Sequence, residues 1–368
     1  MQPPIRRGQH LSPSHSPRVG RPVVGLAFNS IGRFAQGGIL RDRMIPRLLE
    51  ADPEALLGDD GLDPEAIRDV AMQDEKPGGH GDRAGAVAAL ELAAWDLNAK
   101  LADEPTYATI ARRHGTAAND SVSVYAAGGY YYPCDADGDG SARQLREELK
   151  RHRDMGFDQF KIKVGGASVA DDLRRIEQTI DVVGTGSQVA VDAHGRFGFV
   201  EAVSLLGAIE PYGLRWFEEP GDPLDYALNA EVTARYPGSV ATGENLFSVV
   251  DVANLARYGG MRPGLDIFQM DPGLSYGLTE YVEQIALLEN AGFDRSQCHP
   301  HGGHVINLHL VAGLGLGGCE AYPGVFQPVG GFPPVCSVEN GRISPPPAPG
   351  FGLELNPGLS GYLEGLCA

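Results

Sequence analysis

The chain has 368 residues, of which 42% are hydrophobic, so it can bury the core of one large domain or of two moderate ones. Its 30 Lys and Arg residues against 48 Asp and Glu residues give a formal net charge of −18. Such a charge argues against nucleic acid and against an anionic membrane surface as partners.

The five cysteines are odd in number and scattered, and none belongs to a CxxC pair, so neither a disulfide framework nor a zinc cage is predicted. No apolar leader opens the chain, and no later apolar run approaches membrane-spanning length. We therefore expect a protein of the reducing cytoplasm that has no membrane partner.

Residues 1–120 are predicted to form a capping domain. The first 22 residues are rich in Pro, Arg and Ser and lack the pattern of a strand. Residues 40–115 are predicted to be mainly helical, because apolar positions recur at helical spacing, most clearly in "GAVAALELAAWDLNAKLADEP". Two glycine-rich stretches are interpreted as loops that bring functional side chains to a site: "QGGILRD" and "EKPGGHGDRAG".

Between residues 121 and 324, short apolar runs alternate with amphipathic helical patterns. The eight predicted strands lie in "SVSVYAAGGYYY", "FKIKVGG", "QVAVDAHG", "LRWFEEP", "VATGENLF", "LDIFQMDP", "QCHPHGG" and "GGCEAYP". Eight β/α units predict an α/β protein with a closed (β/α)8 TIM barrel. The lack of a GxGxxG motif after the first strand argues against an open doubly wound sheet. Residues 325–368 are predicted to complete the cap, which becomes an α+β domain built from both termini.

Seven consecutive predicted strands, from the second to the eighth, end in an ionisable residue. These residues are Lys163, Asp192, Glu218, Glu244, Asp271, His301 and Glu320. The carboxyl ends of barrel strands meet at one rim, where barrel enzymes carry their active sites. We therefore expect these seven side chains to converge.

Three of these residues are carboxylates on neighbouring strands, Asp192, Glu218 and Glu244. Carboxylates so close would raise each other's pKa unless a cation neutralised them. Ligation by oxygen alone favours Mg²⁺, or Mn²⁺, over zinc. The alternative is that each carboxylate caps the helix after its strand, but three carboxylates at nearly equal spacing favour the metal site.

The segment "FKIKVGG" places Lys161 and Lys163 on one face of the second strand, because side chains alternate along a strand. An exposed lysine face on a surface strand is the alternative. Beside a metal, the positive field would lower the pKa of Lys163 and allow it to act as a base. Asp271 could hold the imidazole of His301, as in a catalytic dyad. Two bases beside a metal suit removal of the proton next to a carboxylate.

This order of residues resembles the enolase superfamily, in its mandelate racemase-like branch. The shared pattern is KxK on the second strand, Asp, Glu and Glu on the third to fifth, Asp and His on the sixth and seventh, and Glu on the eighth. Within that branch the similarity is greatest to the D-tartrate dehydratases, in stretches such as "FNSIGRFAQGGILRDR", "EKPGGHGDRAGAVA" and "PHGGH". The resemblance extends from about residue 23 to the end of the chain.

The resemblance implies an enolase-like barrel with a cap and a role for each rim residue. Lys163 would remove the α-proton of the substrate, and His301, paired with Asp271, would assist the departure of hydroxide. The implied Mg²⁺ ligands are Asp192, Glu218 and Glu244. A hydroxy-dicarboxylic acid is the implied partner, and a homo-oligomer is expected.

Four further residues are implied to bind the substrate. Lys161 and Glu320 would lie at the carboxylate next to the metal, whereas Asn29 and Lys76, on loops of the cap, would contact the distal end. A closed cap would exclude water and determine specificity.

Two features depart from the family pattern. The first 22 residues do not resemble the longer, strand-forming start of the family. His194 stands where the relatives carry Asn, two residues after Asp192. We interpret His194 as a hydrogen-bonding substitute, or else as an additional titrating group that alters substrate choice. Three other histidines in matched loops are interpreted as structural: His80, His299 and His304.

Three functions remain open from the sequence. The first is a Mg²⁺-dependent dehydratase, with D-tartrate converted to oxaloacetate and water as its expected reaction and another sugar acid as the alternative substrate. The second is a racemase or epimerase of a hydroxy acid that uses the same two bases. The third is a binding protein that keeps the fold without catalysis.

Overall fold

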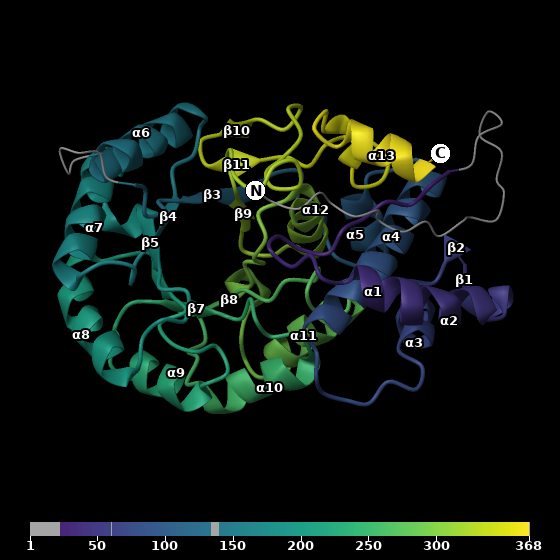
Figure 1. The fold of residues 1–368 in the computed structure, drawn as a ribbon, viewed down its shortest axis with the longest axis horizontal. Coiled ribbons are helices and arrows are strands. Elements are labelled where there is room, and N and C mark those ends of the chain that lie inside the picture. Colours follow the sequence, from purple (N-terminus) through teal and green to yellow (C-terminus); the bar gives the residue numbers. More distant parts are fainter. Residues whose placement is uncertain (1–22, 60, 134–139, 368) are drawn as a thin grey trace.

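The structure is a computed structural model that describes residues 23–59, 61–133 and 140–367. The interpretation of residues 1–22 therefore falls outside the described residues. Within these ranges, the molecule consists of a curled parallel sheet surrounded by helices and a helical cap on one side (Figure 1). No helix in the described ranges combines the length and apolarity needed to span a bilayer.

The cap begins with a continuous helical stretch over residues 37–50, made of α1 (Gly37–Ile39), the π-turn η1 (Leu40–Met44) and α2 (Ile45–Glu50). The loop predicted for "QGGILRD" is therefore wrong for most of that stretch. Leu40, Met44 and Leu48 recur every four residues and are buried in the cap core. This apolar face outweighs the low helix propensity of the two glycines at the helix start.

The remaining cap is also mainly helical, as expected for residues 40–115. Its elements are η2 (Pro53–Leu56), β1 (Leu57–Gly58), β2 (Gly61–Leu62), α3 (Pro64–Ala71), α4 (Asp82–Ala102) and α5 (Thr106–His114). Helix α4 is buried along most of its length, because the cap packs on one side of it and the barrel on another. The buried Glu91 of α4 accepts the backbone N–H groups of Leu278 and Thr279, both at 2.9 Å, and so links the cap to a barrel helix.

The barrel strands are β3 (Val122–Gly128), β4 (Phe160–Lys163), β5 (Val189–Asp192), β6 (Trp216–Glu218), β7 (Val240–Thr242), β8 (Ile267–Phe268) and β9 (Cys319–Ala321). Strands β3 to β8 pair in parallel in chain order, and β9 pairs in parallel with β3. The seventh predicted strand is reduced to a single bridge between Phe268 and Cys298. The hydrogen bond from Gly317 N to Cys298 O, 3.1 Å, continues the ring toward β9. The predicted barrel is confirmed as a curled parallel sheet.

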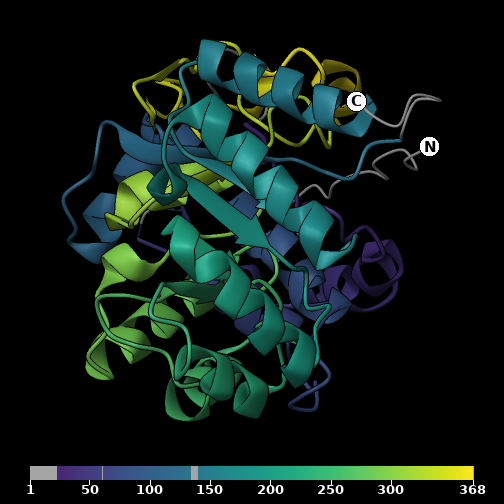
Figure 2. The ribbon, with the colours of Figure 1, turned by 90° about the vertical axis from the view of Figure 1, so that its left-hand side faces the viewer.

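In the part of the chain that the structure describes, the helices that cover the outside of this sheet are α6 (Gly140–Asp154), α7 (Val169–Val183), α8 (Phe199–Ile209), α9 (Tyr226–Thr233), α10 (Val249–Tyr258), α11 (Leu278–Asn290) and α12 (Val305–Leu314). Figure 2 shows α6, α7 and α8 side by side against the sheet. Short 3₁₀ turns lie between them: η3 (Gly186–Gln188), η4 (Glu210–Tyr212) and η5 (Arg295–Gln297). This arrangement is the predicted alternation of strands with crossover helices.

The C-terminal part contains β10 (Val338–Glu339), β11 (Arg342–Ile343), η6 (Leu353–Leu355) and α13 (Ser360–Cys367). Strand β11 pairs antiparallel with β3 of the barrel. Gly350 in turn exchanges backbone hydrogen bonds with Glu104 and Thr106 of the cap. The C-terminal part thus contacts both the barrel and the cap, and the domain boundary at residue 325 stays a prediction.

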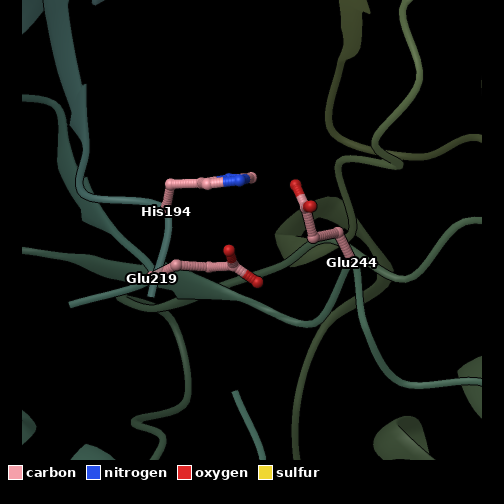
Figure 3. Close-up of side chains that lie close together, drawn as sticks. All are labelled: His194, Glu219 and Glu244. Atoms are coloured by element: carbon pink, nitrogen blue, oxygen red, sulfur yellow. The ribbon is translucent and has the colours of Figure 1, made fainter. Parts of the chain in front are cut away.

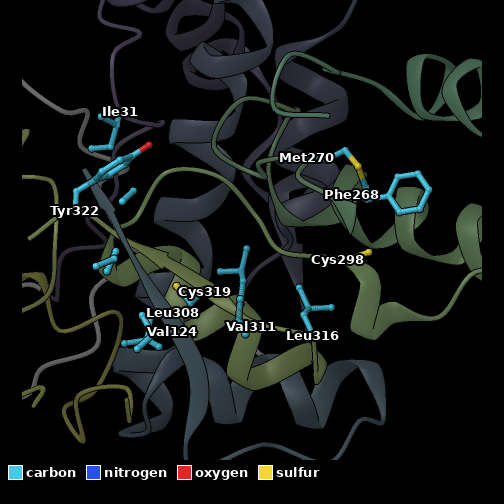
Figure 4. Close-up of a cluster of buried hydrophobic side chains, with 14 of the residues drawn as sticks. Ile31, Val124, Phe268, Met270, Cys298, Leu308, Val311, Leu316, Cys319 and Tyr322 are labelled. Atoms are coloured by element: carbon cyan, nitrogen blue, oxygen red, sulfur yellow. The ribbon is translucent and has the colours of Figure 1, made fainter. Parts of the chain in front are cut away.

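Strand alternation determines which side chains face the inside of the barrel. Trp216 packs with Tyr125, Ala190 and Ala241 in a small interior cluster, whereas Phe217 belongs to the large core between sheet and helices. Figure 4 shows part of that large core. Because Glu218 follows Phe217, it faces the barrel interior like Trp216.

Candidate active site

The strand register brings the first three rim residues into one row. Lys163 is the Cα partner of Asp192, and Asp192 is the Cα partner of Glu218. Each is the last residue of its strand, on β4, β5 and β6. Their side chains therefore leave neighbouring strands at the same height, as the spacing in the sequence predicts.

Both lysines of the "FKIK" strand point into this row. Lys161 Nζ lies 2.5 Å from Glu218 Oε1, 2.7 Å from Glu320 Oε1 and 3.5 Å from Asp192 Oδ2. Burial opposes the charged form of Lys161, but Glu218 and Glu320 outweigh it and raise its pKa well above the usual value. Lys161 is therefore an ammonium held among carboxylates, and the alternative of an exposed lysine face is excluded.

Among the described residues, the close side-chain partner of Lys163 Nζ is Asp192 Oδ2, at 2.5 Å. Burial alone would lower the pKa of Lys163, but the Asp192 carboxylate raises it above the usual value. The sequence analysis expected a lowered pKa beside a metal, and the ion pair with Asp192 acts in the opposite direction. In this arrangement Lys163 is protonated.

The carboxylates of Asp192 and Glu218 have several donors. Asp192 Oδ1 accepts the backbone N–H of His194 at 2.8 Å, and the two lysines lower the pKa of Asp192 against the effect of burial. Glu218 Oε2 accepts hydrogen bonds from Trp216 Nε1 at 2.9 Å and Gln269 Nε2 at 2.7 Å. Burial nevertheless raises the pKa of Glu218 to about 8, although the positive charge of Lys161 lowers it.

A second group on the same rim has the geometry of a metal site. Within the described ranges, ligand atoms of His194, Glu219 and Glu244 all lie within 4.8 Å of one another. Figure 3 shows the three side chains directed toward a common space. Burial and then Glu244, Asp192 and Glu218 raise the pKa of Glu219 well above its usual value. The neighbouring carboxylates thus disfavour the ionised form of Glu219, and a divalent cation held by this group would stabilise that form.

Of the three ligands expected from the sequence, only Glu244 belongs to this group. Asp192 and Glu218 lie in the neighbouring lysine network. Sequence reasoning did not single out Glu219, although the second Glu of "FEEP" is a visible signal for it. His194, which was noted only as a departure, faces the same space as Glu219 and Glu244.

Asp271 and His301 lie in contact, as a dyad requires. His301 Nδ1 is 3.2 Å from Asp271 Oδ2, and both side chains are buried. Burial opposes the charged imidazole, but Glu244 and Asp271 outweigh it and raise the pKa of His301 to about 9. The other ring nitrogen, Nε2, lies 3.3 Å from Tyr322 Oη and 3.6 Å from Glu244 Oε2. His301 therefore connects the dyad to the carboxylate rim.

Glu320 is fully buried. One oxygen contacts Lys161, and the other accepts the backbone N–H of Gly302 at 3.0 Å. It therefore links the lysine strand to the loop that carries His301. The structural interpretation of two further histidines agrees with their burial, which lowers the pKa of His299 to about 3 and of His304 to about 4.

The two cap residues implied by the resemblance are placed differently. Asn29 is half-buried, and its Nδ2 donates to the carbonyl oxygen of Arg33 at 2.6 Å. Lys76 is exposed, and its carbonyl oxygen accepts from Arg83 at 3.0 Å. Arg83 and His80 both contact Tyr276 Oη of the barrel, so the loop that carries Lys76 is anchored to the barrel.

The structure adds one cation that sequence reasoning missed. Arg33 Nη2 donates to Asn245 Oδ1 at 3.1 Å and lies 3.7 Å from Glu244 Oε1. One third of its side chain is exposed. Arg33 lies four residues after Asn29 in "FNSIGRF", and no local pattern marks it, because its partners are more than 200 residues away.

Comparisons with known proteins show which family the chain belongs to. The chain is 26% identical over 280 residues to arabinonate dehydratase of Saccharolobus solfataricus, which covers 74% of this chain and 70% of the relative. It is 27% identical over 262 residues to L-talarate/galactarate dehydratase of Salmonella typhimurium, which covers 71% of this chain and 61% of the relative.

A solved structure also matches, that of a racemase from Streptomyces coelicolor with bound magnesium. Its TM-score is 0.70 at 25% identity, covering 86% of this chain and 80% of the other. The model of the enolase C-terminal domain-like family matches residues 144–359, more than half of the chain. The chain therefore belongs to the enolase C-terminal domain-like family, within the enolase and mandelate racemase superfamily.

Proposed function

We propose that this protein is a divalent-metal-dependent dehydratase of an acid sugar, and that its substrate is the hydroxy-dicarboxylic acid D-tartrate, converted to oxaloacetate and water. The observation that carries the proposal is the rim itself. An ammonium, Lys163, and an imidazole, His301, flank a cluster of buried carboxylates. The matches to arabinonate and talarate/galactarate dehydratases support the same reaction class.

The carboxylate cluster fits a hard divalent cation, Mg²⁺ or alternatively Mn²⁺, because carboxylate oxygens are the ligands that such ions prefer. We assign Asp192, Glu218 and Glu244 as ligands from the family resemblance, with His194 and Glu219 next to them. The bound cation would hold the substrate carboxylate and stabilise the negative charge that develops when the α-proton leaves.

The protein groups divide the remaining chemistry. Lys163 accepts the α-proton at Nζ as a neutral amine, which requires that Nζ first release a proton to solvent and no longer be paired with Asp192. His301 donates the proton at Nε2 to the departing hydroxyl, while Asp271 holds Nδ1. Lys161 and Glu320 lie at the substrate carboxylate, and the enol product becomes a keto acid.

Two cations of the cap support the proposal that the substrate carries a second carboxylate. Arg33 brings a guanidinium to the carboxylate rim, and guanidinium groups match carboxylates in geometry and charge. Lys76 is a second cation on the cap, and Asn29 supports the turn that carries Arg33. A four-carbon diacid is short enough to reach both the metal and the cap, whereas an aldonate would present an uncharged polyol there.

A racemase or epimerase is the second candidate. A lysine and a histidine around one carbon also describe a two-base proton exchanger, and the similar Streptomyces coelicolor structure is that of a racemase. A binding protein without turnover is the third. For each of these three functions we propose the same kind of partner, a small hydroxy acid, and we expect a homo-oligomer.

One experiment separates the three functions. The purified protein is incubated with Mg²⁺ and with D-, L- and meso-tartrate or a set of aldonates, and both keto acid and substrate stereochemistry are measured. A dehydratase forms keto acid, whereas a racemase changes only the stereochemistry. Metal binding without either product would support the binding protein.

A further inference from the structure

A serine of the cap touches the catalytic dyad of the barrel. The Ser30 hydroxyl donates a hydrogen bond to Asp271 Oδ2, across 241 positions of sequence. Ser30 is only 1% exposed, and Asp271 is fully buried. This contact joins the segment that carries Asn29 and Arg33 to the residue that holds His301.

Among the described residues, the Asp271 carboxylate accepts four hydrogen bonds, three from the barrel and one from the cap. Oδ1 accepts from the backbone N–H of Gly273 at 2.8 Å and from Asn307 Nδ2 at 3.3 Å, both in the barrel. Oδ2 accepts from His301 Nδ1 and from Ser30. A carboxylate has about four acceptor positions, so these donors together determine its rotation. Among the described residues, Ser30 is the cap's side-chain contribution to that set.

The backbone around Ser30 is held at the same place. A Cβ atom added to Gly273 would lie 2.5 Å from the carbonyl oxygen of Asn29, so the cap segment packs directly on the loop after Asp271. Ile31 is 2% exposed and belongs to the same hydrophobic cluster as Tyr322 (Figure 4). Tyr322 Oη in turn lies 3.3 Å from His301 Nε2. Residues 29 and 30 therefore contact Asp271, the partner of His301 Nδ1, and the loop that follows it.

We infer that Ser30 is a positioning residue for the acid of the proposed reaction. Its hydroxyl holds Asp271 in the rotation that directs the Nε2 of His301 toward the departing hydroxyl, so the cap that contacts the substrate also orients the acid. The inference rests on the proposed function. It assigns Ser30 no part in removal of the α-proton, which is the role of Lys163 on β4.

The test measures removal of the α-proton and loss of the hydroxyl separately. Wild-type protein and Ser30→Ala are incubated with Mg²⁺ and D-tartrate in D₂O, and deuterium incorporation at the α-carbon is compared with keto-acid formation. We expect Ser30→Ala to slow dehydration about tenfold, which is the effect of losing one hydrogen bond to a charged group. Exchange is expected to change little, so the ratio of exchange to dehydration rises. An unchanged ratio in Ser30→Ala would overturn the inference.

Two further variants separate positioning from general damage. Ser30→Thr keeps the hydroxyl and is expected to restore the wild-type ratio. Arg68→Gln removes another cap–barrel contact, the ion pair of Arg68 with Glu283 at 2.9 Å, and is expected to leave the ratio unchanged. If Arg68→Gln raised the ratio as much as Ser30→Ala, the effect would belong to cap docking in general.

A second measurement remains decisive if the wild-type protein dehydrates no hydroxy acid. In that case the proposed function fails, and the Ser30 contact is read from the imidazole of His301 by ¹⁵N NMR, with His301→Asn used to assign its signals. We expect a slowly exchanging proton on Nδ1 in the wild type and faster exchange in Ser30→Ala. Equal exchange rates would show that Ser30 does not position the dyad.

Discussion

Lys163 and Asp192 are Cα partners on adjacent strands, and Lys163 Nζ lies 2.5 Å from Asp192 Oδ2. The expected base and one expected metal ligand therefore neutralise each other in this arrangement. A base must be able to lose its proton, and an ion pair with a carboxylate prevents that. A cation that bound Asp192 would remove this partner from Lys163.

The first prediction follows from this pair. Removal of divalent ions with excess EDTA is expected to abolish keto-acid formation, because Lys163 then stays paired with Asp192 and the substrate carboxylate has no cation to bind. Addition of Mg²⁺ is expected to restore it. Full activity in excess EDTA would contradict the metal assignment.

Calorimetric titration with Mg²⁺ shows which glutamate is the ligand. Glu218→Gln is expected to weaken Mg²⁺ binding more than the matched neighbour Glu219→Gln. The reverse order would assign the cation to the group of His194, Glu219 and Glu244 instead.

The second prediction divides the work of the two bases. His301→Asn is expected to stop dehydration while Lys163 still exchanges the substrate α-proton with deuterium from solvent. Lys163→Ala is expected to lose both activities, by about 10²- to 10⁴-fold, the usual contribution of a general base. If Lys163→Ala still exchanged the α-proton, the base would be another residue.

The third prediction concerns the two cations of the cap. Arg33→Gln and Lys76→Ala are each expected to lower kcat/KM for D-tartrate about tenfold or more, because each removes a charged partner of the distal carboxylate. Neither is expected to lower kcat/KM for an aldonate as much. Arg41→Gln serves as the control, since Arg41 is exposed and pairs with Asp42. A parent enzyme that prefers an aldonate, or a Lys76→Ala variant as active on D-tartrate as the parent, would refute the substrate assignment.

The fourth prediction is a pH dependence of stability. His309 is fully buried, its Nδ1 accepts from Tyr107 N–H at 3.2 Å, and burial lowers its pKa to about 3. Because the folded pKa lies below the unfolded value of about 6.5, the contribution of His309 to stability is complete above pH 6.5 and is lost as the pH falls. Between pH 7 and pH 5 the free energy of unfolding should fall by about 2 kcal/mol from this group.

Urea unfolding at pH 7 and pH 5 measures this loss. His309→Gln keeps a hydrogen-bond acceptor but does not titrate, so the difference between the two pH values is expected to shrink by about 2 kcal/mol. An unchanged difference would mean that His309 is not held neutral in the folded protein.

The sequence by itself determined the order of the strands and the last residues of three of them, Lys163 of β4, Asp192 of β5 and Glu218 of β6. Strands β7 and β8 end at Thr242 and Phe268, so Glu244 and Asp271 lie in the loops that follow these strands. Alternation of side chains along "FKIK" was sufficient to place Lys161 and Lys163 on one face, and equal spacing was sufficient to place Asp192 and Glu218 on neighbouring strands. Two local predictions were wrong. The apolar spacing of Leu40, Met44 and Leu48 made a helix where glycines suggested a loop. The seventh strand contracted to a single bridge at Cys298.

Only the tertiary structure decided which side chains form ion pairs and hydrogen bonds with one another. It paired Asp192 and Glu218 with lysines, and it directed Glu219 and His194 toward Glu244. It also brought Ser30 to Asp271 and Arg33 to Asn245, across more than 200 residues. Sequence periodicity reports the face of an element and the point where it ends, which are local properties. Contacts between the cap and the rim depend on closure of the barrel and docking of the cap. Local sequence patterns do not predict either of these.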